Sequence, residues 1–330
     1  MSPRMIKKVT FIEKEAALVE EELPALEEDQ ILVKTVVSLI SPGTERAALT
    51  RLWDDAGFRA SPGYALAGEV VETGSQVKGF KVGERVITLK NHASYSVTTT
   101  DPWTTLKIPA GVNPEDATFL PLASVALHAL RRLQVQFGDT VAIIGAGIIG
   151  QIATQLAQMN GAHKVVILDM VDKRLELARH YGADLTINPG KEDAVEKLFA
   201  FTQGQGAPAI LEVTGNTKVL PMAFKLAAVG GRICLAGVME EPHPLAFHQE
   251  FLSRELTLVA AHQPHCPVTE NIYYRWTQQE NRQLLLTLFA EGKLKVSEMI
   301  THRFPATEAP EAYERIKAGD AAMLGALLVW

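Results

Sequence analysis

The spacing of hydrophobic positions changes near residue 116. Before it, short apolar runs alternate with turns rich in Gly, Pro and charged residues, as in QILVKTVVSLI (30–40), ALAGEVVETG (65–74) and ERVITL (84–89). Such runs are typical of β-strands. The pattern therefore predicts an all-β module over roughly the first 100 residues.

From Asp116 the apolar positions follow helical spacing in DATFLPLASVALHALRRL, and strands and helices then alternate strictly. Helical segments include KRLELARHYG (173–182) and KVLPMAFKLAAVG (218–230). The strand candidates are VAIIGA, KVVILD, DLTIN, AILEVTG, GRICLAGV and LTLVAAH. This alternation predicts an α/β fold with a doubly wound, parallel sheet of six strands that ends near His262.

The end of the chain returns to a mixed pattern. ENRQLLLTLFAEGKLK and APEAYERIKAG predict two helices, and ALLVW predicts a strand. We expect these elements to pack on the N-terminal module, so that residues 1–117 and 263–330 form one domain and residues 118–262 form the other. A cleft between two such domains is the expected place for a substrate.

Composition narrows the class of protein. A length of 330 residues with 47% hydrophobic residues fits a soluble enzyme of two domains, and a net charge of −6 argues against a nucleic-acid partner. No apolar run approaches the ~20 residues of a membrane helix, and the N-terminus has no signal-type apolar stretch, so we predict a cytoplasmic protein with no membrane contact. The two cysteines, Cys234 and Cys266, exclude a disulfide framework and a four-cysteine zinc site.

Residues 140–172 read as a strand, a glycine turn, a helix and a second strand. Gly145 permits the tight turn, Gly147 lets the backbone approach a pyrophosphate, and Gly150 allows the helix to pack closely on the strand. The backbone N–H groups of the helix that begins with Ile148 and Ile149 then face the phosphates. This stretch predicts a dinucleotide-binding βαβ unit.

An acidic residue closes the second strand of this unit. Asp169 lies 24 residues after Gly145. There its carboxylate is able to accept hydrogen bonds from an adenosine 2′-hydroxyl, whereas it repels a 2′-phosphate. We therefore predict NAD as the cofactor rather than NADP.

Several blocks resemble one family over nearly the whole chain. The blocks are GYALAGEVVETGSQVKGFKVGERV, the glycine turn from Gly145 to Gly150, LEVTGN, GGRICLAGV and GKLKVSEMITHRFPATEAPEAYERIKAG. They resemble the medium-chain dehydrogenase/reductase superfamily, which includes zinc alcohol dehydrogenases and quinone reductases. The resemblance implies an N-terminal GroES-like β domain, a central Rossmann domain and a C-terminal return to the first domain.

The same resemblance implies further cofactor-binding residues. Arg174 matches the basic residue over the adenosine ribose. Strand ends that line the nicotinamide match Thr214, Gly237, Val238 and Ala261. His262 follows the sixth strand, in a loop whose polar side chains face cofactor or solvent.

The sequence departs from the zinc enzymes at every position of a catalytic zinc ligand. Ser41-Pro42-Gly43-Thr44-Glu45 stands where the family has Cys-Gly-Thr/Ser-Asp, and Gly63-Tyr64-Ala65 replaces Gly-His-Glu. The third ligand position falls on Pro121 or Leu122. Hydroxyl and apolar side chains are poor zinc ligands. We therefore predict a metal-free member of a zinc-free branch, and we interpret the AAHQPHC cluster as a loop rather than a metal site.

Without zinc, a side chain has to exchange the hydroxyl proton. His92 lies on a segment that runs beside the substrate cleft in this family, and imidazole groups commonly exchange protons near neutral pH. The alternative is a loop histidine without a role. Tyr64 either hydrogen-bonds a substrate oxygen or only fills the space of the lost ligand. Glu45, with Thr44, either orients His92 or binds substrate hydroxyls; the alternative for Glu45 is a salt bridge with Arg46 or Arg51.

SPGTE and PGY are similar to a zinc-free branch that acts on sugars, cyclitols and biosynthetic intermediates. We therefore favour an NAD-dependent dehydrogenase of a secondary alcohol on a polyhydroxylated or ring-bearing small molecule. Two alternatives stay open: an NAD(P)H-dependent enoyl or quinone reductase, which Asp169 disfavours, and a non-catalytic dinucleotide-binding protein. The family also implies a homodimer that pairs the Rossmann edge strand, residues 256–262, and an unpaired apolar edge is an aggregation hazard.

Overall fold

The computed structural model describes residues 4–50, 61–239, 241–272 and 274–330. The chain divides into two compact units. The first comprises Met1–Pro121 and Val268–Trp330, and the second comprises Leu122–Pro267. The predicted domain ends, after residues 117 and 262, lie close to these.

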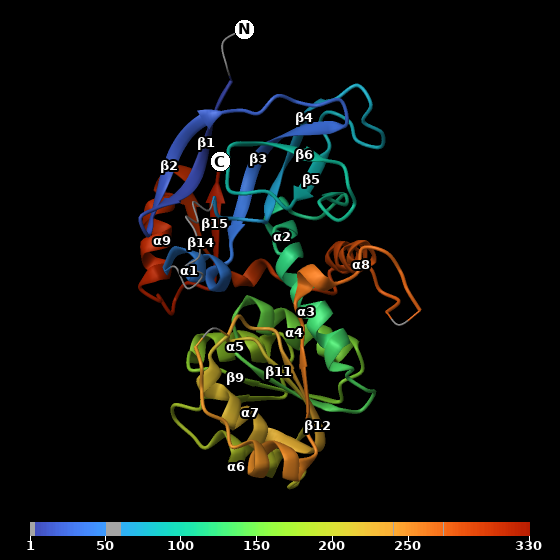
Figure 1. Cartoon of the computed structure of the whole chain (residues 1–330), viewed down its shortest axis with the longest axis vertical. Helices are drawn as coiled ribbons and strands as arrows, with labels where there is room; N and C mark the ends of the chain where they lie inside the picture. The colour runs from blue at the N-terminus through green and yellow to red at the C-terminus, as the bar shows by residue number, and fades with distance from the viewer. Residues whose placement is uncertain (1–3, 51–60, 240, 273) are drawn as a thin grey trace. The chain divides into compact units, whose positions relative to one another are not determined.

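The second unit is built on a parallel sheet of six strands in the order β10-β9-β8-β11-β12-β13 (Figure 1). The predicted doubly wound Rossmann sheet is therefore confirmed. Its apolar runs form strands because both faces of such a sheet are covered and its positions are buried without alternation. The strands are β8 (Thr140–Ile144), β9 (Lys164–Leu168), β10 (Leu185–Ile187), β11 (Ala207–Glu212), β12 (Ala227–Leu235) and β13 (Thr257–Ala260).

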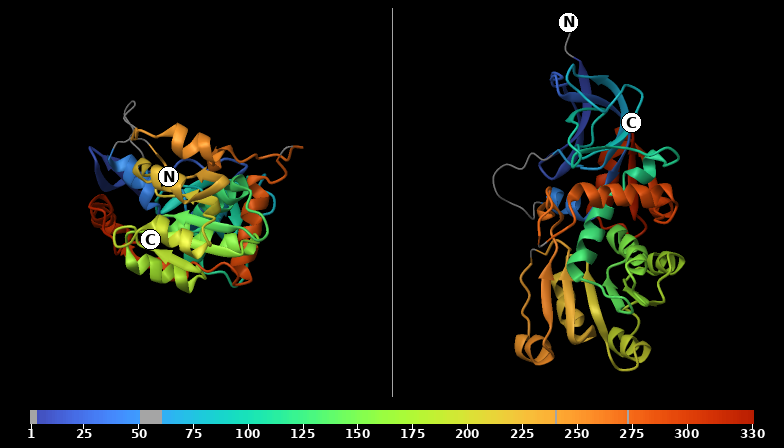
Figure 2. Two further views of the ribbon diagram at one scale, coloured as in Figure 1. Left: turned by 90° about the horizontal axis from the view of Figure 1, so that it is seen from below. Right: turned by 90° about the vertical axis from the view of Figure 1, so that its right-hand side faces the viewer.

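Helices connect these strands by crossovers, which are right-handed in nearly all parallel sheets. The strand order reverses after β10, so α4 and α5 lie on one face of the sheet and α6 and α7 on the other (Figures 1 and 2). Ile144, Leu198 and Phe224 belong to the core of this unit. The helices are α3 (Leu120–Leu133), α4 (Ile148–Met159), α5 (Asp172–His180), α6 (Ala194–Phe201) and α7 (Leu220–Leu226).

Two predicted helices have different bounds in the structure. The segment 116–133 is divided between α2 (Pro114–Ala117) and α3. The helix predicted over 218–230 ends at Leu226, because Ala227 is extended and begins β12. Gly230, with a φ of 73°, is in the left-handed region, which glycine adopts at little cost. The apolar AAVGG segment therefore belongs to a strand.

The first unit contains a two-stranded sheet of β1 and β2 and a seven-stranded sheet. The second of these follows the order β14-β15-β3-β4-β5-β7, and β6 pairs with β3 off this path. This β-rich unit confirms the predicted GroES-like domain. Its strands are β1 (Met5–Ile12), β2 (Glu15–Glu22), β3 (Gln30–Ile40), β4 (Leu66–Thr73), β5 (Arg85–Thr88), β6 (Tyr95–Thr99), β7 (Thr105–Lys107), β14 (Ile300–Pro305) and β15 (Gly325–Val329).

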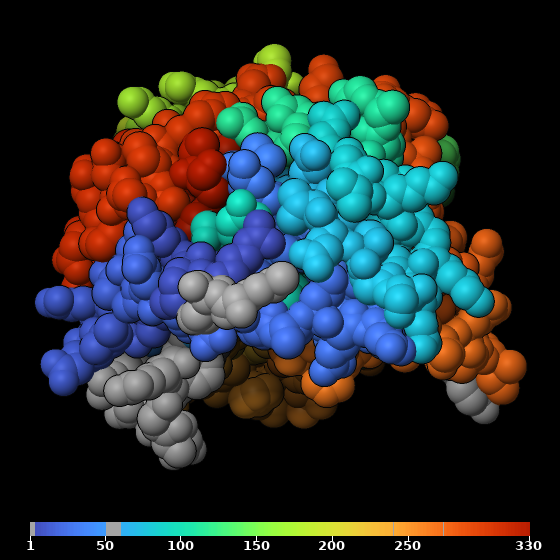
Figure 3. Space-filling view, turned by 90° about the horizontal axis from the view of Figure 1, so that it is seen from above, coloured from blue at the N-terminus to red at the C-terminus, as the bar shows by residue number. Residues whose placement is uncertain are grey.

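The end of the chain completes this unit, as predicted. Strand β15 pairs antiparallel with β3, and α9 (Ala309–Lys317) packs on β2. Phe11 and Tyr313 meet edge to face, with ring centroids 5.0 Å apart. Residues from the start of the chain, in blue, and from its end, in red, therefore adjoin on the face in Figure 3. The helix predicted over 280–295 is α8 (Gln278–Ala290).

A helix in the N-terminal module corrects the all-β prediction. Helix α1 (Pro42–Thr50) follows directly on β3. Pro42 is its first residue, where the fixed φ of proline suits a helix and no N–H is needed. Glu45 reaches back and accepts a hydrogen bond from the backbone N–H of Ser41 at 2.7 Å. This contact satisfies a donor at the helix start, in the manner of a capping box.

None of the helices in the described residues has the length and apolar character needed to cross a membrane.

Candidate functional site

The glycine turn of the second unit has the predicted geometry. Gly145 has a φ of 108°, which favours glycine. A Cβ on Gly150 would lie 1.8 Å from the carbonyl oxygen of Gly145, so only glycine allows α4 to pack so closely on the turn. A Cβ on Gly147 would meet nothing within 4 Å. The backbone conformation and packing of the protein itself therefore require glycine at 145 and 150, whereas Gly147 leaves space for a ligand.

Helix α4 presents its first backbone N–H groups at this turn. Gly147 is the N-cap residue and provides no side-chain cap. Uncapped N–H groups at a helix N-terminus favour an anion. The turn and the N-terminus of α4, with Ile148 and Ile149, therefore fit the pyrophosphate of a dinucleotide.

Asp169 follows β9 and is partly exposed. One of its carboxylate oxygens accepts from the N–H of Ala146 at 2.7 Å, and the other accepts from the N–H of Val171 at 2.8 Å. These bonds fix the carboxylate beside the glycine turn. Each oxygen keeps a second lone pair, so the group is still able to accept from ribose hydroxyls. Arg174, in the first turn of α5, is partly exposed, and its backbone carbonyl accepts from the Gln151 side chain at 2.7 Å.

Glu212 is a buried carboxylate that the sequence analysis missed. It ends β11 with no exposed surface. It accepts from the backbone N–H of Thr214 at 2.6 Å and from the Thr214 hydroxyl. Burial raises the pKa of Glu212, although the hydrogen bonds from Thr214 and Gly215 oppose the shift. The signal in the sequence was an acidic residue within the apolar strand AILEV.

The Glu212 contacts change the interpretation of Thr214. Both donors of Thr214 are used by Glu212, so neither is available to a nicotinamide amide. Gly237 lies against the same turn, because a Cβ on it would approach the backbone nitrogen of Gly215 to 2.2 Å and Oε2 of Glu212 to 2.9 Å. Glu212 and Gly237 thus shape the turn that was predicted to line the nicotinamide.

The other predicted nicotinamide residues lie at the ends of β12 and β13. Val238 is 48% exposed, whereas Ala261 is buried and donates its N–H to the carbonyl of Leu235 at 2.9 Å. His262 is exposed, and its Nδ1 lies 2.8 Å from Nδ1 of His265, so one ring donates to the other.

In the first unit, the hydroxyl groups of Ser41, Thr44 and Tyr64 meet. The Tyr64 hydroxyl donates to Oγ of Ser41 at 2.6 Å and also hydrogen-bonds with Thr44. Tyr64 and Thr44 are partly exposed, whereas Ser41 is buried. Burial of the Tyr64 hydroxyl is the main cause that raises its pKa, and the charge of Glu45 adds to the shift. The phenol is therefore neutral at neutral pH and acts as a hydrogen-bond or proton donor.

His92 does not fit the predicted role of proton-transfer group. Its side chain has no exposed surface. Its Nδ1 lies 2.7 Å from Oγ of Ser38, and its Nε2 lies 3.2 Å from Oε2 of Glu45. Both ring nitrogens are thus engaged by protein side chains, and neither is open to a substrate. The long-range contacts that bury His92 are not visible in the local sequence.

Glu45 orients His92, which was one of its predicted roles. It is 3% exposed, so it does not offer its carboxylate to substrate hydroxyls. Oε2 of Glu45 also accepts from the hydroxyl of Tyr313, whose pKa burial raises well above its ordinary value. Among the alternative partners, Arg46 is exposed and Arg51 lies outside the described residues.

Ser41 and Tyr64 do not fit a catalytic zinc. Zinc in proteins is bound by thiolate, imidazole or carboxylate groups. Ser41 and Tyr64 offer hydroxyls that are hydrogen-bonded to each other. Across the described parts of the chain, His, Cys, Asp and Glu side chains form no group of three that could hold a metal ion.

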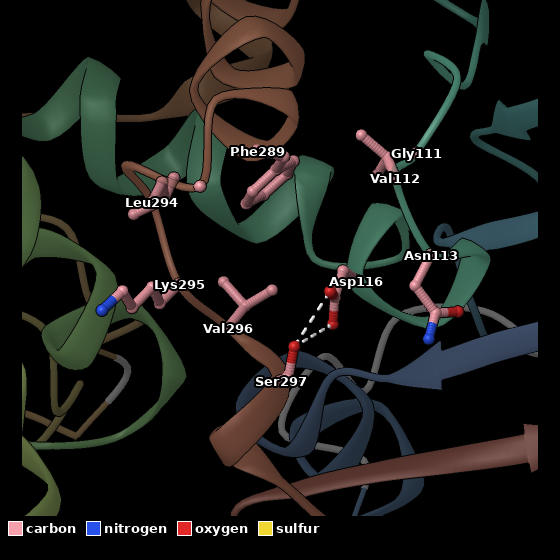
Figure 4. A pocket seen from close by; sticks show the side chains of 10 residues that line it. Gly111, Val112, Asn113, Asp116, Phe289, Leu294, Lys295, Val296 and Ser297 are labelled. Atoms are coloured by element: carbon pink, nitrogen blue, oxygen red, sulfur yellow. Dashed lines mark hydrogen bonds between the residues drawn. The ribbon is translucent and has the colours of Figure 1, made fainter.

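A pocket of about 180 Å³ lies elsewhere in the first unit (Figure 4). Ser297 donates to the Asp116 carboxylate there, with oxygen–oxygen distances of 2.8 and 2.9 Å. Burial raises the pKa of Asp116. Val112 and Phe289 also line this pocket, and none of the predicted site residues does.

Comparisons with known proteins agree with this fold. The alcohol dehydrogenase GroES-like domain matches residues 27–105, and the zinc-binding dehydrogenase family matches residues 149–274. L-Threonine 3-dehydrogenase of Bacillus licheniformis is 27% identical over 336 aligned residues, which cover 90% of this chain and 91% of the relative. D-Guloside 3-dehydrogenase of Escherichia coli is 28% identical over 255 aligned residues, which cover 76% of this chain and 72% of the relative.

The fold is also similar to solved structures. An Escherichia coli oxidoreductase/dehydrogenase of unknown specificity, involved in membrane biogenesis, superposes with a TM-score of 0.86 at 21% identity, over 99% of each chain. At this identity the likeness concerns the fold alone. The two family matches and the named relatives carry the assignment further: the chain belongs to the medium-chain dehydrogenase/reductase superfamily of zinc-type alcohol dehydrogenase-like proteins and is an NAD(P)-dependent oxidoreductase of alcohols and ketones.

Proposed function

We propose that the protein is a zinc-independent, NAD-dependent dehydrogenase that interconverts a secondary alcohol and a ketone, with Tyr64 as the proton-transfer group. The hydrogen bond of 2.6 Å between Tyr64 and Ser41 carries this proposal. In the family resemblance, these two residues occupy the first two ligand positions of catalytic zinc. The neutral phenol of Tyr64 offers a proton there, where the zinc enzymes offer a metal.

The proposed proton transfer is reversible. In ketone reduction, the Tyr64 O–H bond breaks and its proton passes to the carbonyl oxygen, and solvent then reprotonates the tyrosinate. In alcohol oxidation, the tyrosinate takes the hydroxyl proton. When bound, NAD supplies the hydride acceptor or donor for the reacting carbon. Ser41 and Thr44 hydrogen-bond the phenol and keep it oriented between turnovers.

The preference for NAD rests on Asp169. The backbone N–H groups of Ala146 and Val171 hold its carboxylate in place. A fixed negative charge at this strand end attracts ribose hydroxyls and repels a 2′-phosphate.

The proposed substrate is a polyhydroxylated or ring-bearing small molecule, such as a sugar, a cyclitol or a biosynthetic intermediate. Thr44 and Tyr64 are partly exposed residues, and a hydroxyl group both donates and accepts hydrogen bonds. A relative that acts on a guloside supports a hydroxyl-rich substrate.

The test is reduction of NAD, measured by absorbance, across sugars, cyclitols, polyols and simple secondary alcohols, with and without a metal chelator. We expect turnover that resists the chelator and falls by about 10²–10⁴-fold in Tyr64→Phe, the range for loss of a general acid or base. Tyr95→Phe is the matched control, because Tyr95 is another partly exposed tyrosine of the same unit.

Three results would contradict parts of the proposal. Loss of turnover with the chelator refutes zinc independence. Unchanged turnover in Tyr64→Phe refutes the role of the phenol. Tight NAD binding without turnover on any alcohol favours an enoyl or quinone reductase or a non-catalytic dinucleotide-binding protein, and assays with enones and quinones separate these two.

The family resemblance also supports a homodimer through the edge strand β13. This strand is last in the sheet order, so among the described residues the backbone groups of its outer side have no strand partner in the sheet. Light scattering should give twice the mass of one chain. Lysine on an edge strand opposes pairing, so Thr257→Lys should give the monomer. Val229→Lys, at an exposed position near the start of β12, should leave the dimer intact. A wild-type monomer refutes the dimer.

A further inference from the structure

A chain of buried polar contacts crosses the interior of the first unit. We call Ser38, Ser41, Glu45, His92 and Tyr313 the buried polar network; each is at most 5% exposed. Three separate segments contribute to it: the stretch from the end of β3 to the start of α1, the loop before β6, and α9. Burial of a carboxylate and an imidazole costs free energy that an apolar core would not, so the network needs an explanation beyond packing.

The donors and acceptors of the network fit a single arrangement. The indole N–H of Trp330 donates to Oγ of Ser38 at 2.9 Å. The Ser38 hydroxyl is then able to donate to Nδ1 of His92, which leaves the ring proton on Nε2 to donate to Glu45. Glu45 also accepts from the N–H of Ser41 and from Tyr313. Three donors thus converge on one carboxylate, and the His92 ring is fixed at both nitrogens.

Glu45 holds Ser41, the hydrogen-bond partner of Tyr64. Oε1 of Glu45 binds the backbone N–H of Ser41 at 2.7 Å, and Oγ of Ser41 binds the hydroxyl of Tyr64 at 2.6 Å. The position of Ser41, and with it the hydrogen-bond acceptor of Tyr64, therefore depends on the Glu45 carboxylate.

His92 holds the segment that carries Tyr64. Its backbone N–H donates to the carbonyl of Pro62 at 3.0 Å. Gly63 packs directly on its ring, because a Cβ on Gly63 would lie 2.7 Å from Cδ2 of His92. The neighbouring Asn91 side chain donates to the carbonyl of Gly63 at 3.1 Å. The segment before Tyr64 is thus fixed to His92.

We propose that Glu45 and His92 are positioning residues that hold Ser41 and Tyr64 in the geometry for proton transfer. Glu45 fixes the Ser41 turn, His92 fixes the Gly63–Tyr64 segment, and the contact between the two side chains sets the separation of the two segments. The inference rests on the proposed role of Tyr64. It explains why these groups are buried together although neither meets the substrate.

The test compares His92→Phe with Tyr313→Phe. His92→Phe keeps a ring against Gly63 and removes both ring nitrogens. Tyr313→Phe removes another donor to the same Glu45 oxygen and leaves the hydrogen bonds of Ser41 and the packing of His92 on Gly63 in place. We expect His92→Phe to lower kcat by about 10–100-fold, since misplacement of a reacting group by ~1 Å costs that order. In His92→Phe, the substrate KM and the NAD Kd should stay within about threefold of wild type. In Tyr313→Phe, kcat should also stay within about threefold of wild type.

Thermal melting separates positioning from a purely structural role. If kcat falls in both variants in proportion to the loss of Tm, the network only stabilises the fold and the proposal is wrong. Unchanged kcat in a folded His92→Phe also overturns it. If His92→Phe does not fold, Glu45→Gln takes its place: its amide oxygen is still able to bind the Ser41 N–H, but the acceptor for His92 is lost, and the same fall in kcat is expected.

Tyr64→Phe distinguishes failure of this inference from failure of the proposed function. If Tyr64→Phe retains full turnover, both fail together. If Tyr64→Phe is inactive while folded His92→Phe and Glu45→Gln turn over at the wild-type rate, only the positioning role fails. Partial recovery of kcat in His92→Gln, whose amide offers a donor and an acceptor, would support positioning over packing.

Discussion

The hydroxyl of Tyr64 donates to Oγ of Ser41 at 2.6 Å, on the two positions where the family resemblance aligns zinc ligands. Neither side chain is a usual zinc ligand, and each satisfies the other. The two residues thus form a hydrogen-bonded pair that includes a neutral phenol. This pair determines how the enzyme should respond to pH.

The proposed reaction should depend on pH in opposite ways for its two directions. Because burial raises the pKa of Tyr64 above its ordinary value of about 10, the phenol stays protonated from pH 6 to 9. Ketone reduction, which needs the proton, should then keep a constant kcat/KM over this range. Alcohol oxidation needs the tyrosinate, so its kcat/KM should rise about tenfold per pH unit. An inflection near pH 6.5 that survives in Tyr64→Phe would instead indicate a histidine.

Two glycines of the same turn should respond differently to alanine. The Cβ of Gly150→Ala would lie 1.8 Å from a backbone oxygen, so we expect a loss at or above the ~1–3 kcal/mol of an overpacked core. Gly147→Ala meets nothing within 4 Å and should keep the wild-type Tm. Its methyl group would occupy the space for the pyrophosphate, so its NAD Kd should rise about tenfold or more, measured by calorimetry. A wild-type Kd would place the pyrophosphate elsewhere.

The sheet of the second unit was predictable because its strands are short apolar runs with helices between them. Helix α1 was not, because Pro42 and Gly43 resemble a turn and the helix depends on Glu45 reaching back to Ser41. The end of α7 was also misplaced, since AAVGG is compatible with either structure until the pairing of β11 with β12 is known.

The candidate site was predictable where its chemistry is local. The glycine turn and Asp169 lie within one βαβ unit, so spacing alone identifies them. The role of His92 depends on Ser38 and Glu45, which are 54 and 47 residues away in the sequence. Those contacts bury the imidazole, and no local pattern reveals them. Glu212 was overlooked because one of its partners, Thr214, was interpreted as a cofactor contact.

Asp169 should control the choice of cofactor. In Asp169→Ala, the N–H groups of Ala146 and Val171 lose their acceptor, and the charge that repels a 2′-phosphate disappears. We expect NAD affinity to fall by about tenfold and the preference for NAD over NADP to shrink by a larger factor, as measured by kcat/KM with each cofactor. Asp184→Ala is the control, because Asp184 binds Lys164 and the N–H of Val165 within the same unit. An unchanged NAD/NADP ratio would remove Asp169 from cofactor selection.

Glu212 should make the stability of the protein depend on pH. Burial raises its pKa in the folded state above the unfolded value, so the folded state binds the proton more tightly. The stabilisation from this proton is fully present below the unfolded pKa and is lost as pH rises through the folded pKa. Glu212→Gln cannot ionise, and its amide oxygen still accepts from Thr214.

The Tm of Glu212→Gln relative to wild type should therefore increase from pH 4 to pH 8, even if the variant is less stable at pH 4. Glu250→Gln, a partly exposed carboxylate of the same unit, is the control and should show a flat difference. Parallel melting curves for Glu212→Gln and wild type across this range would mean that the Thr214 and Gly215 donors cancel the cost of burial. NAD binding should weaken in Glu212→Ala, where the turn loses its acceptor, and less in Glu212→Gln, which keeps it.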